Sequence, residues 1–238
     1  MPTLTALTAH SRRAGRYTVS IDGVALALGA GGEHNGEPER QPRRGRPSTA
    51  PRPALVDVAL VHDLALKVGM ELPDDTLRSL VDGALQVEAM DRALGMLARR
   101  AHSRRELERG LSQKGSPRSA IDAVVTRLGN TGHLDDQSFA EAFARSRLVG
   151  RGQSRRRVAA ELAKRGVARS DVDRALRRVA AEEGVDDMEQ ARRAAQKKLR
   201  GLAKLAPEVA RRRLLAYLMR QGFDGDVVRR ATAELFAK

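Results

Sequence analysis

The sequence contains no cysteine and no tryptophan, and it has only two tyrosines and four phenylalanines. Without cysteine, disulfide bonds and thiolate metal sites are excluded, which fits a reducing compartment and favours a cytoplasmic protein. No run of about 18 apolar residues occurs, so no membrane span is predicted. The scarcity of aromatic residues argues against stacking platforms for single-stranded nucleic acid. A core of leucine, valine and alanine suits helices more than sheets.

Positive charge is concentrated in the later part of the chain. The net charge is +14, but residues 1–90 carry 10 Lys and Arg against 11 Asp and Glu, whereas residues 91–238 carry 34 against 19. A coding bias toward arginine would not spare the first 90 residues. We therefore interpret the excess as a surface that meets a polyanion. The alternative is a charge that serves only solubility.

A basic segment occurs three times. Each copy has two or three arginines near its start, apolar residues four apart and a glycine at its end. The copies are Ser103–Gly115, Ser154–Gly166 and Ala210–Gly222, and their glycines lie 51 and 56 residues apart. Two apolar positions seven residues apart follow each glycine. The recurrence predicts tandem repeats, each with a basic helix, a glycine stop in left-handed geometry and a second amphipathic helix.

This pattern predicts a mainly α protein with three tandem three-helix repeats behind a small α+β module. A further amphipathic helix precedes each basic segment. We expect the module at residues 1–87 and the repeats at residues 88–133, 134–184 and 185–238. A helix that starts at Pro73 is expected to continue through Gly83 into the first repeat.

The N-terminal module is expected to contain a β-hairpin. Arg16–Ile21 alternates apolar and polar residues, and Asp22-Gly23 is a hairpin turn signal, so Val24–Leu28 would return as the second strand. Residues 1–15 show no period and are expected to be frayed. Residues 29–53 are rich in glycine, proline, arginine and glutamate, and we interpret them as a disordered insertion. A third strand within Ala54–Ala59 and a helix over Leu60–Val68 complete the prediction.

The cations of the basic segments are the candidate binding residues. In the first two repeats the arginines lie in the first turn of a helix, where the helix dipole makes each cation cost about a few tenths of a kcal/mol. Repeated tolerance of that cost indicates another use, namely contact with phosphate or an acidic protein surface. The alternative is pairing with Glu106, Glu108 or Glu161 on the same helices. The candidates are Arg104, Arg105, Lys114, Arg155, Arg156, Arg157, Lys164, Arg165, Arg211, Arg212 and Arg213.

No catalytic constellation is apparent. Asp135-Asp136 beside His133 could indicate metal or acid–base chemistry in a hydrolase, but an amphipathic run follows at once, so helix capping explains the pair better. His62 and His102 are expected at the surface or its boundary. No phosphate-binding glycine loop, nucleophile elbow or zinc spacing occurs. We expect neither enzymatic activity nor a cofactor or metal.

Two segments resemble the RecX family, bacterial regulators of the RecA recombinase. Residues 93–107 read ALGMLARRAHSRREL and residues 132–140 read GHLDDQSFA, and both are similar to motifs of that family in the same order. The likeness is strong over about residues 88–184 and looser over 185–238.

The resemblance implies three tandem three-helix units in an elongated, curved array. It also implies binding in the groove of the RecA–DNA filament, with restraint of ATP hydrolysis, strand exchange and repressor cleavage in recombination, DNA repair and the SOS response. We expect a monomer whose partners are the RecA filament and, through phosphate contacts, single- and double-stranded DNA. The alternative is a helical DNA-binding protein that acts without RecA.

Overall fold

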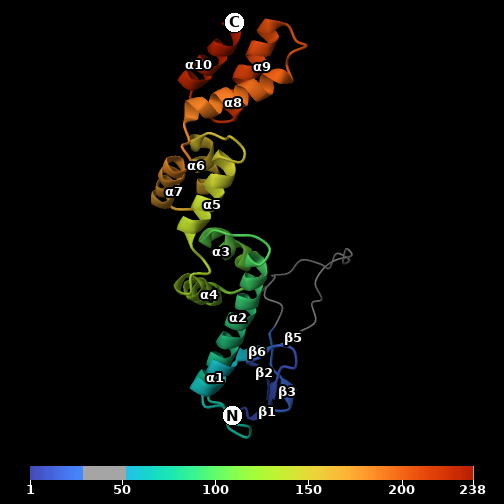
Figure 1. Cartoon of the computed structure of the whole chain (residues 1–238). Helices are drawn as coiled ribbons and strands as arrows, with labels where there is room; N and C mark the ends of the chain where they lie inside the picture. The colour runs from blue at the N-terminus through green and yellow to red at the C-terminus, as the bar shows by residue number, and fades with distance from the viewer. Residues whose placement is uncertain (29–51, 238) are drawn as a thin grey trace, which may run out of the picture. The chain divides into compact units, whose positions relative to one another are not determined.

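The structure is a computed structural model that describes residues 1–28 and 52–237 (Figure 1). The described chain divides into two compact units. One comprises Met1–Ala101 and Leu107–His133, and the other comprises His102–Glu106 and Leu134–Lys238. Of the insertion predicted at residues 29–53, residues 29–51 lie outside the described part. Arg52 and Pro53 are described, and they form a short strand.

The first unit combines a small sheet with helices. Its strands are β1 (Leu4–Ala9), β2 (Arg16–Ile21), β3 (Val24–Ala25), β4 (Ala27–Leu28), β5 (Arg52–Pro53) and β6 (Leu55–Asp57). Its helices are α1 (Val58–Asp63), α2 (Asp74–Leu97), α4 (Arg118–Asn130) and all but the first residues of α3 (Arg104–Gln113).

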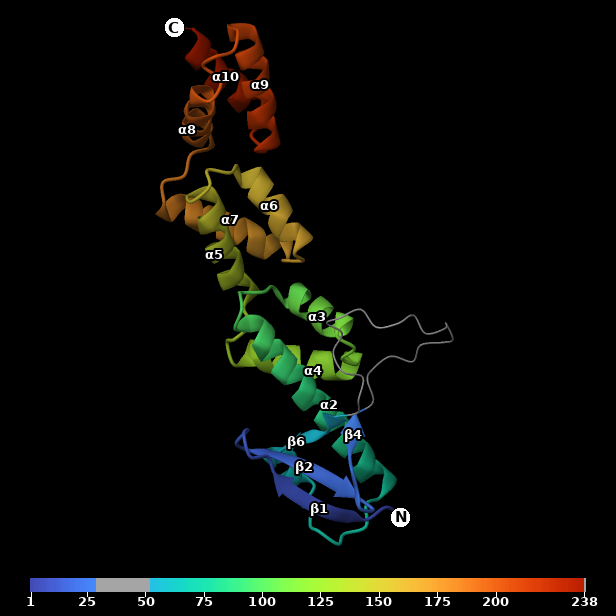
Figure 2. The same ribbon diagram turned by 90° about the vertical axis from the view of Figure 1, so that its right-hand side faces the viewer.

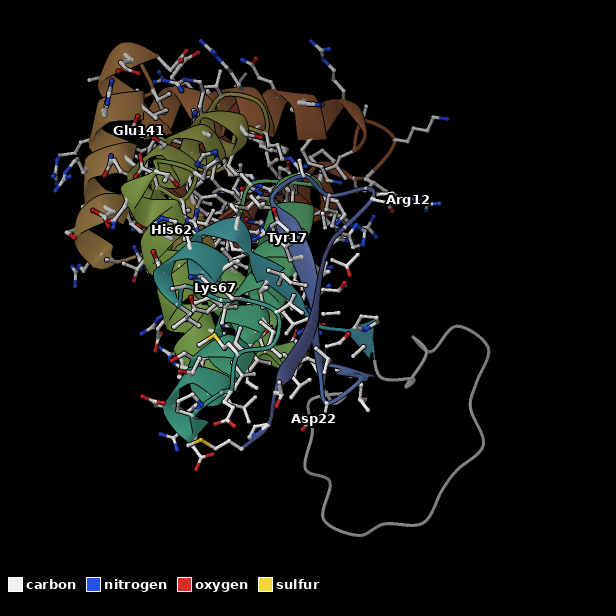
Figure 3. All side chains as sticks on the ribbon, turned by 90° about the horizontal axis from the view of Figure 1, so that it is seen from below. Arg12, Tyr17, Asp22, His62, Lys67 and Glu141 are labelled. Atoms are coloured by element: carbon white, nitrogen blue, oxygen red, sulfur yellow. The ribbon has the colours of Figure 1, made fainter. Side chains whose placement is uncertain are left out.

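Strand β2 is the centre of the sheet and pairs antiparallel with β1, β3 and β6, while β4 pairs separately with β5. The predicted hairpin turn is confirmed, because Asp22 and Gly23 both have positive φ values of 48° and 78°. Figure 3 labels Asp22 at this bend. The predicted single returning strand instead breaks at Leu26 into β3 and β4.

The prediction that residues 1–15 are frayed is wrong for β1. Leu4 is fully buried, its amide donates to the Met70 carbonyl at 2.9 Å, and its carbonyl accepts from the Gly69 amide at 2.8 Å. The register with β2 shifts between Leu4 and Ala6. This irregularity interrupts the alternation of apolar and polar residues by which a strand is recognised in sequence.

Helix α2 begins directly after Pro73 and runs unbroken through Gly83, as expected. A Cβ atom at Gly83 would collide with the Leu60 side chain of α1, so the glycine permits close packing of these two helices. Helix α1 is shorter than the predicted Leu60–Val68, because it ends at Asp63 and Ala65 adopts a positive φ of 48°. The sheet packs beside the N-terminal half of α2 (Figure 2).

The second unit contains two three-helix bundles. The helices are α5 (Asp136–Leu148), α6 (Arg155–Lys164), α7 (Arg169–Glu182), α8 (Asp187–Arg200), α9 (Pro207–Arg220) and α10 (Gly225–Phe236). One core is built around Leu148, Val158 and Leu162, and the other around Leu214, Leu218 and Phe223; the two share no buried residue. The mainly α fold with three three-helix repeats and an N-terminal α+β module is thus confirmed.

The predicted helix boundaries of the basic segments are present. The three closing glycines, Gly115, Gly166 and Gly222, have φ values of 77°, 82° and 83°. Ser103 and Glu106 form a reciprocal capping box at the start of α3: the Glu106 amide donates to Ser103 Oγ at 3.2 Å and the Ser103 amide donates to the Glu106 carboxylate at 3.3 Å. These local signals are read directly from short stretches of sequence.

Candidate nucleic-acid interface

Seven of the eleven candidate cations are exposed, and none of the seven forms an ion pair with another residue of the described chain. They are Arg104, Arg105, Lys114, Lys164, Arg211, Arg212 and Arg213. Such side chains can contact an anionic partner without first giving up a carboxylate. They are the part of the predicted surface that is directly accessible for binding.

Arg211–Arg213 form the densest free group. Helix α9 begins at Pro207, so these arginines lie inside the helix and not in its first turn. The neighbouring Ala210 and Leu214 are buried, with 4% and 0% of their surface exposed, and they belong to the core of their repeat. Because successive residues of a helix are about 100° apart, the three arginines fan across its outer side.

Arg155–Arg157 of α6 are engaged within the second unit. Arg155 Nε lies 3.3 Å from Asp187 Oδ2, and Arg156 lies 3.5 Å from Asp224 Oδ1. These partners belong to the next repeat along the chain. The structure therefore places two of the three arginines in ion pairs that the sequence did not predict.

Arg157 is the most constrained of the group. Its Nε lies 3.1 Å from Glu161, and its terminal nitrogen donates to the Arg220 carbonyl at 2.8 Å and to Gln221 Oε1 at 3.3 Å. The pairing with Glu161 confirms, for this residue, the alternative of an ion pair within one helix. The bonds to the end of α9 give Arg157 a structural role between repeats.

Arg165 also has internal partners. It lies 2.6 Å from Glu106, and its guanidinium stands 4.9 Å from the centroid of the Phe143 ring. Arg147 stands at the same distance from that ring and is 3.7 Å from Glu161. Cations over an aromatic face are attracted by the ring quadrupole, so the contact with Phe143 holds Arg165 against its own repeat, whereas Glu106 belongs to the first repeat.

A serine at the start of each of the first two basic helices contacts the end of the following basic helix. Ser103 Oγ donates to the Arg165 carbonyl at 2.6 Å, and Ser154 Oγ donates to the Gln221 carbonyl at 3.0 Å. Each serine also accepts an amide of its own first turn. The same residue therefore caps one helix and satisfies the free carbonyl end of another.

An aspartate reinforces both contacts. Asp136 accepts from the Arg104 amide at 2.7 Å, and Asp187, 51 residues later, pairs with Arg155. Each carboxylate lies in the first turn of the helix that opens its own repeat. Sequence reasoning missed this role, although the equal spacing of the aspartate pairs and the basic segments was a signal for it.

The Asp135-Asp136 pair is used for structure. Asp135 accepts from the Gln137 amide at 2.9 Å and from Ser138 Oγ at 2.6 Å, and the hydrogen bond from Ser138 is the main cause that lowers the pKa of Asp135. The predicted capping role of Asp135 is confirmed. His133 is exposed, with Nδ1 3.0 Å from Thr131 Oγ1.

His62 is exposed as expected, whereas His102, expected at the surface or its boundary, is buried at 9% exposure. No three His, Cys, Asp or Glu residues in the described ranges are grouped to hold a metal ion. None of the helices described is long and apolar enough to cross a membrane.

Comparison with known proteins identifies the repeats. Three domains of one family match the chain: "RecX, first three-helix domain" at residues 89–128, "RecX, second three-helix domain" at 135–176 and "RecX, third three-helix domain" at 185–232. The chain belongs to the RecX family. Its members are named as regulatory proteins.

RecX proteins from several bacteria are similar over most of their length. The chain is 39% identical over 151 residues to regulatory protein RecX of Halorhodospira halophila, covering 63% of this chain and 90% of that one. It is 32% identical over 182 residues to RecX of Geobacillus kaustophilus, covering 75% of this chain and 65% of that one.

Solved RecX structures share the fold. A crystal structure of regulatory protein RecX aligns with a TM-score of 0.68 at 18% identity, covering 96% of this chain and 98% of that one. RecX from Lactobacillus salivarius aligns with a TM-score of 0.54, also at 18% identity, covering 65% and 98%. At this identity the likeness concerns the fold alone.

Proposed function

We propose that this RecX-family protein regulates the RecA recombinase. It binds in the groove of the RecA–DNA filament and restrains ATP hydrolysis and strand exchange during recombination, DNA repair and the SOS response. Membership of a family of regulatory proteins supports this function. The main support for the proposed binding surface is the exposed, unpaired Arg211–Arg213 group on α9.

The free cations are the proposed contacts with the filament. Guanidinium groups bind phosphate and carboxylate through two parallel hydrogen bonds, so they suit either DNA or an acidic protein surface. In this proposal the repeats act as units with bounds 88–133, 134–184 and 185–238, behind the module at 1–87. The protein works as a cytoplasmic monomer without catalytic activity.

Hydrolysis of ATP by RecA on single-stranded DNA tests the proposal. The wild-type protein should lower the rate of hydrolysis at amounts well below equimolar with RecA. The triple variant R211A/R212A/R213A should require several-fold more protein for the same inhibition. Arg169→Ala, Arg174→Ala and Arg177→Ala together make a matched control, because they remove the same charge from the exposed side of α7. Unchanged hydrolysis at equimolar wild-type protein would refute the regulatory function.

A second candidate function is DNA binding independent of RecA. The observation that favours it is the succession of arginines without other base-reading side chains, which suits phosphate contact more than base readout. Gel shifts that compare naked DNA with RecA-coated DNA separate the two functions. Equal affinity for both substrates, with no effect on hydrolysis, would favour the second.

A further inference from the structure

Apart from Val185, which packs against the core of the second repeat, the second and third repeats meet through polar groups. Their cores have no buried residue in common. We use the term 2–3 joint for the contacts that link the start of α6 to the third repeat; these are made by Ser154, Arg155, Arg156 and Arg157 with Asp187, Arg220, Gln221 and Asp224. A connection of this kind is held by hydrogen bonds and charge, so it responds to ions in a way that an apolar interface does not.

Two ion pairs form the accessible edge of the 2–3 joint. The side chains of Arg155 and Asp187 are 42% and 32% exposed, and those of Arg156 and Asp224 are 79% and 71% exposed. Exposed pairs of this kind contribute little to stability and are screened by salt. A competing anion can therefore reach both arginines and replace their carboxylates.

The interior of this region is incompletely hydrogen-bonded. Gln153 Oε1, Asp187 Oδ1 and Gln190 Oε1 are buried and have no hydrogen-bond partner among the described residues. Gln190 uses its amide nitrogen to donate to the Leu148 carbonyl at 2.9 Å, which leaves its oxygen unpaired. A buried acceptor without a partner is unfavourable, and separation of the two repeats would expose it to water.

The corresponding contacts of the first turn of α3 are tighter. Glu106 and Arg165 approach to 2.6 Å, with side chains that are 14% and 31% exposed. The equivalent serine bond is also shorter, at 2.6 Å for Ser103 against 3.0 Å for Ser154. Of the two sets of contacts, the 2–3 joint is therefore the one that an external anion would open first.

We infer that the 2–3 joint is a hinge that opens when phosphate groups take Arg155 and Arg156 from Asp187 and Asp224. This inference rests on the proposed function, because it requires a polyanionic partner. A nucleic-acid backbone presents closely spaced phosphates, each able to accept two hydrogen bonds from a guanidinium. Once both carboxylates are released, the bonds of Ser154 and Arg157 to the end of α9 and the hydrogen bond from Gln190 to Leu148 still connect the two repeats.

Fluorescence resonance energy transfer tests the hinge directly. The chain has no cysteine, so Ser170→Cys on α7 and Ala203→Cys after α8, both at exposed positions, allow clean labelling of the two repeats. The probe is a 30-nucleotide oligothymidylate at low salt, with its binding followed by anisotropy. We expect half of the change in transfer efficiency to occur at the oligonucleotide concentration that gives half-maximal binding.

Two variants connect the change to the proposed ion pairs. In D187N/D224N the transfer efficiency should already differ before the oligonucleotide is added, and the oligonucleotide should change it little. In R155Q/R156Q the protein should still bind through its other cations, but without a change in transfer. Circular dichroism should show native helix content in both, because neither core is altered.

The outcomes separate the hinge from the proposed function. Binding of oligothymidylate with unchanged transfer in the otherwise wild-type protein would overturn the hinge and leave the proposed function intact. The same transfer change in R155Q/R156Q would also overturn it, because the movement would then not depend on these arginines. Absence of binding at low salt would overturn both the DNA contacts and the hinge.

Discussion

The two arginine clusters of the second unit should differ in their contribution to nucleic-acid binding. Arg211–Arg213 are free, whereas Arg155 and Arg156 must exchange carboxylates for phosphates and Arg157 is held by Glu161 and by the end of α9. The variants to compare are R211A/R212A/R213A and R155A/R156A/R157A. Both remove three positive charges, so any difference reflects position and not net charge.

The expected difference follows from counterion release. Each phosphate of a single strand neutralised by the protein contributes about 0.7 to the slope of log affinity against log salt, so loss of Arg211–Arg213 should lower the slope by about 2. Over a fourfold rise in salt, the affinity of this variant should therefore fall about sixteenfold less than that of the wild-type protein. For the other variant the loss should be under about 1, because Asp187 and Asp224, when released, bind cations from solution and offset the counterions leaving the DNA.

Anisotropy of a labelled oligothymidylate between 50 and 200 mM KCl measures both slopes. Thermal unfolding of the same samples checks folding, and R155A/R156A/R157A should be the less stable variant, because it loses the bonds from Arg157 to Arg220 and Gln221. A larger loss of slope in this variant than in R211A/R212A/R213A would refute the assignment of Arg155–Arg157 to the 2–3 joint.

Two predictions concern stability. Gly166→Ala should lower the unfolding free energy by about 1–2 kcal/mol for the left-handed backbone and by a further 1–3 kcal/mol, roughly, for overlap with Arg105, whose Cβ lies 2.6 Å from the added Cβ atom. The control Gly184→Ala, at φ 60° with nothing within 4 Å, should show only the first loss in chemical denaturation. Asp135→Ala should cost about 1 kcal/mol at pH 7, because a helix cap is lost. Since the folded protein lowers the pKa of Asp135, its carboxylate stabilises the fold at neutral pH, and the difference from wild type should shrink as the pH falls through that lowered pKa.

Each of these predictions has a result that contradicts it. Equal losses for Gly166→Ala and Gly184→Ala would mean that the Arg105 side chain moves aside without cost. A difference between wild type and Asp135→Ala that stays constant from pH 7 to pH 2 would mean that the ionised carboxylate is not what caps α5.

The parts of the fold that were predictable depend on neighbours in sequence. The glycine stops, the capping box at Ser103 and the cap at Asp135 are each formed within a few residues, so short patterns identify them. The three-helix repeats were predictable for a related reason: the same local pattern returns at a nearly constant interval. Strand β1 was not predicted because its bulge removes the period-2 alternation, and because its partners come from a distant loop as well as from β2.

The candidate site was only partly predictable, because residues far away in the sequence decide whether an arginine is paired or free. Ser154 reaches a carbonyl 67 residues away, and Arg156 meets a carboxylate 68 residues away. Charge counting treats Arg155–Arg157 and Arg211–Arg213 as equivalent clusters. Only the packing of one repeat on the next distinguishes cations that are engaged from cations that are free.

The third copy of the basic segment has no serine at the position of Ser103 and Ser154. Helix α9 has Ala206 as its N-cap, without a side-chain hydrogen bond, and the residue aligned with Ser103 and Ser154 is the buried Ala210. Helix α9 therefore lacks the hydroxyl that, in Ser103 and Ser154, caps one basic helix and binds the last carbonyls of the next.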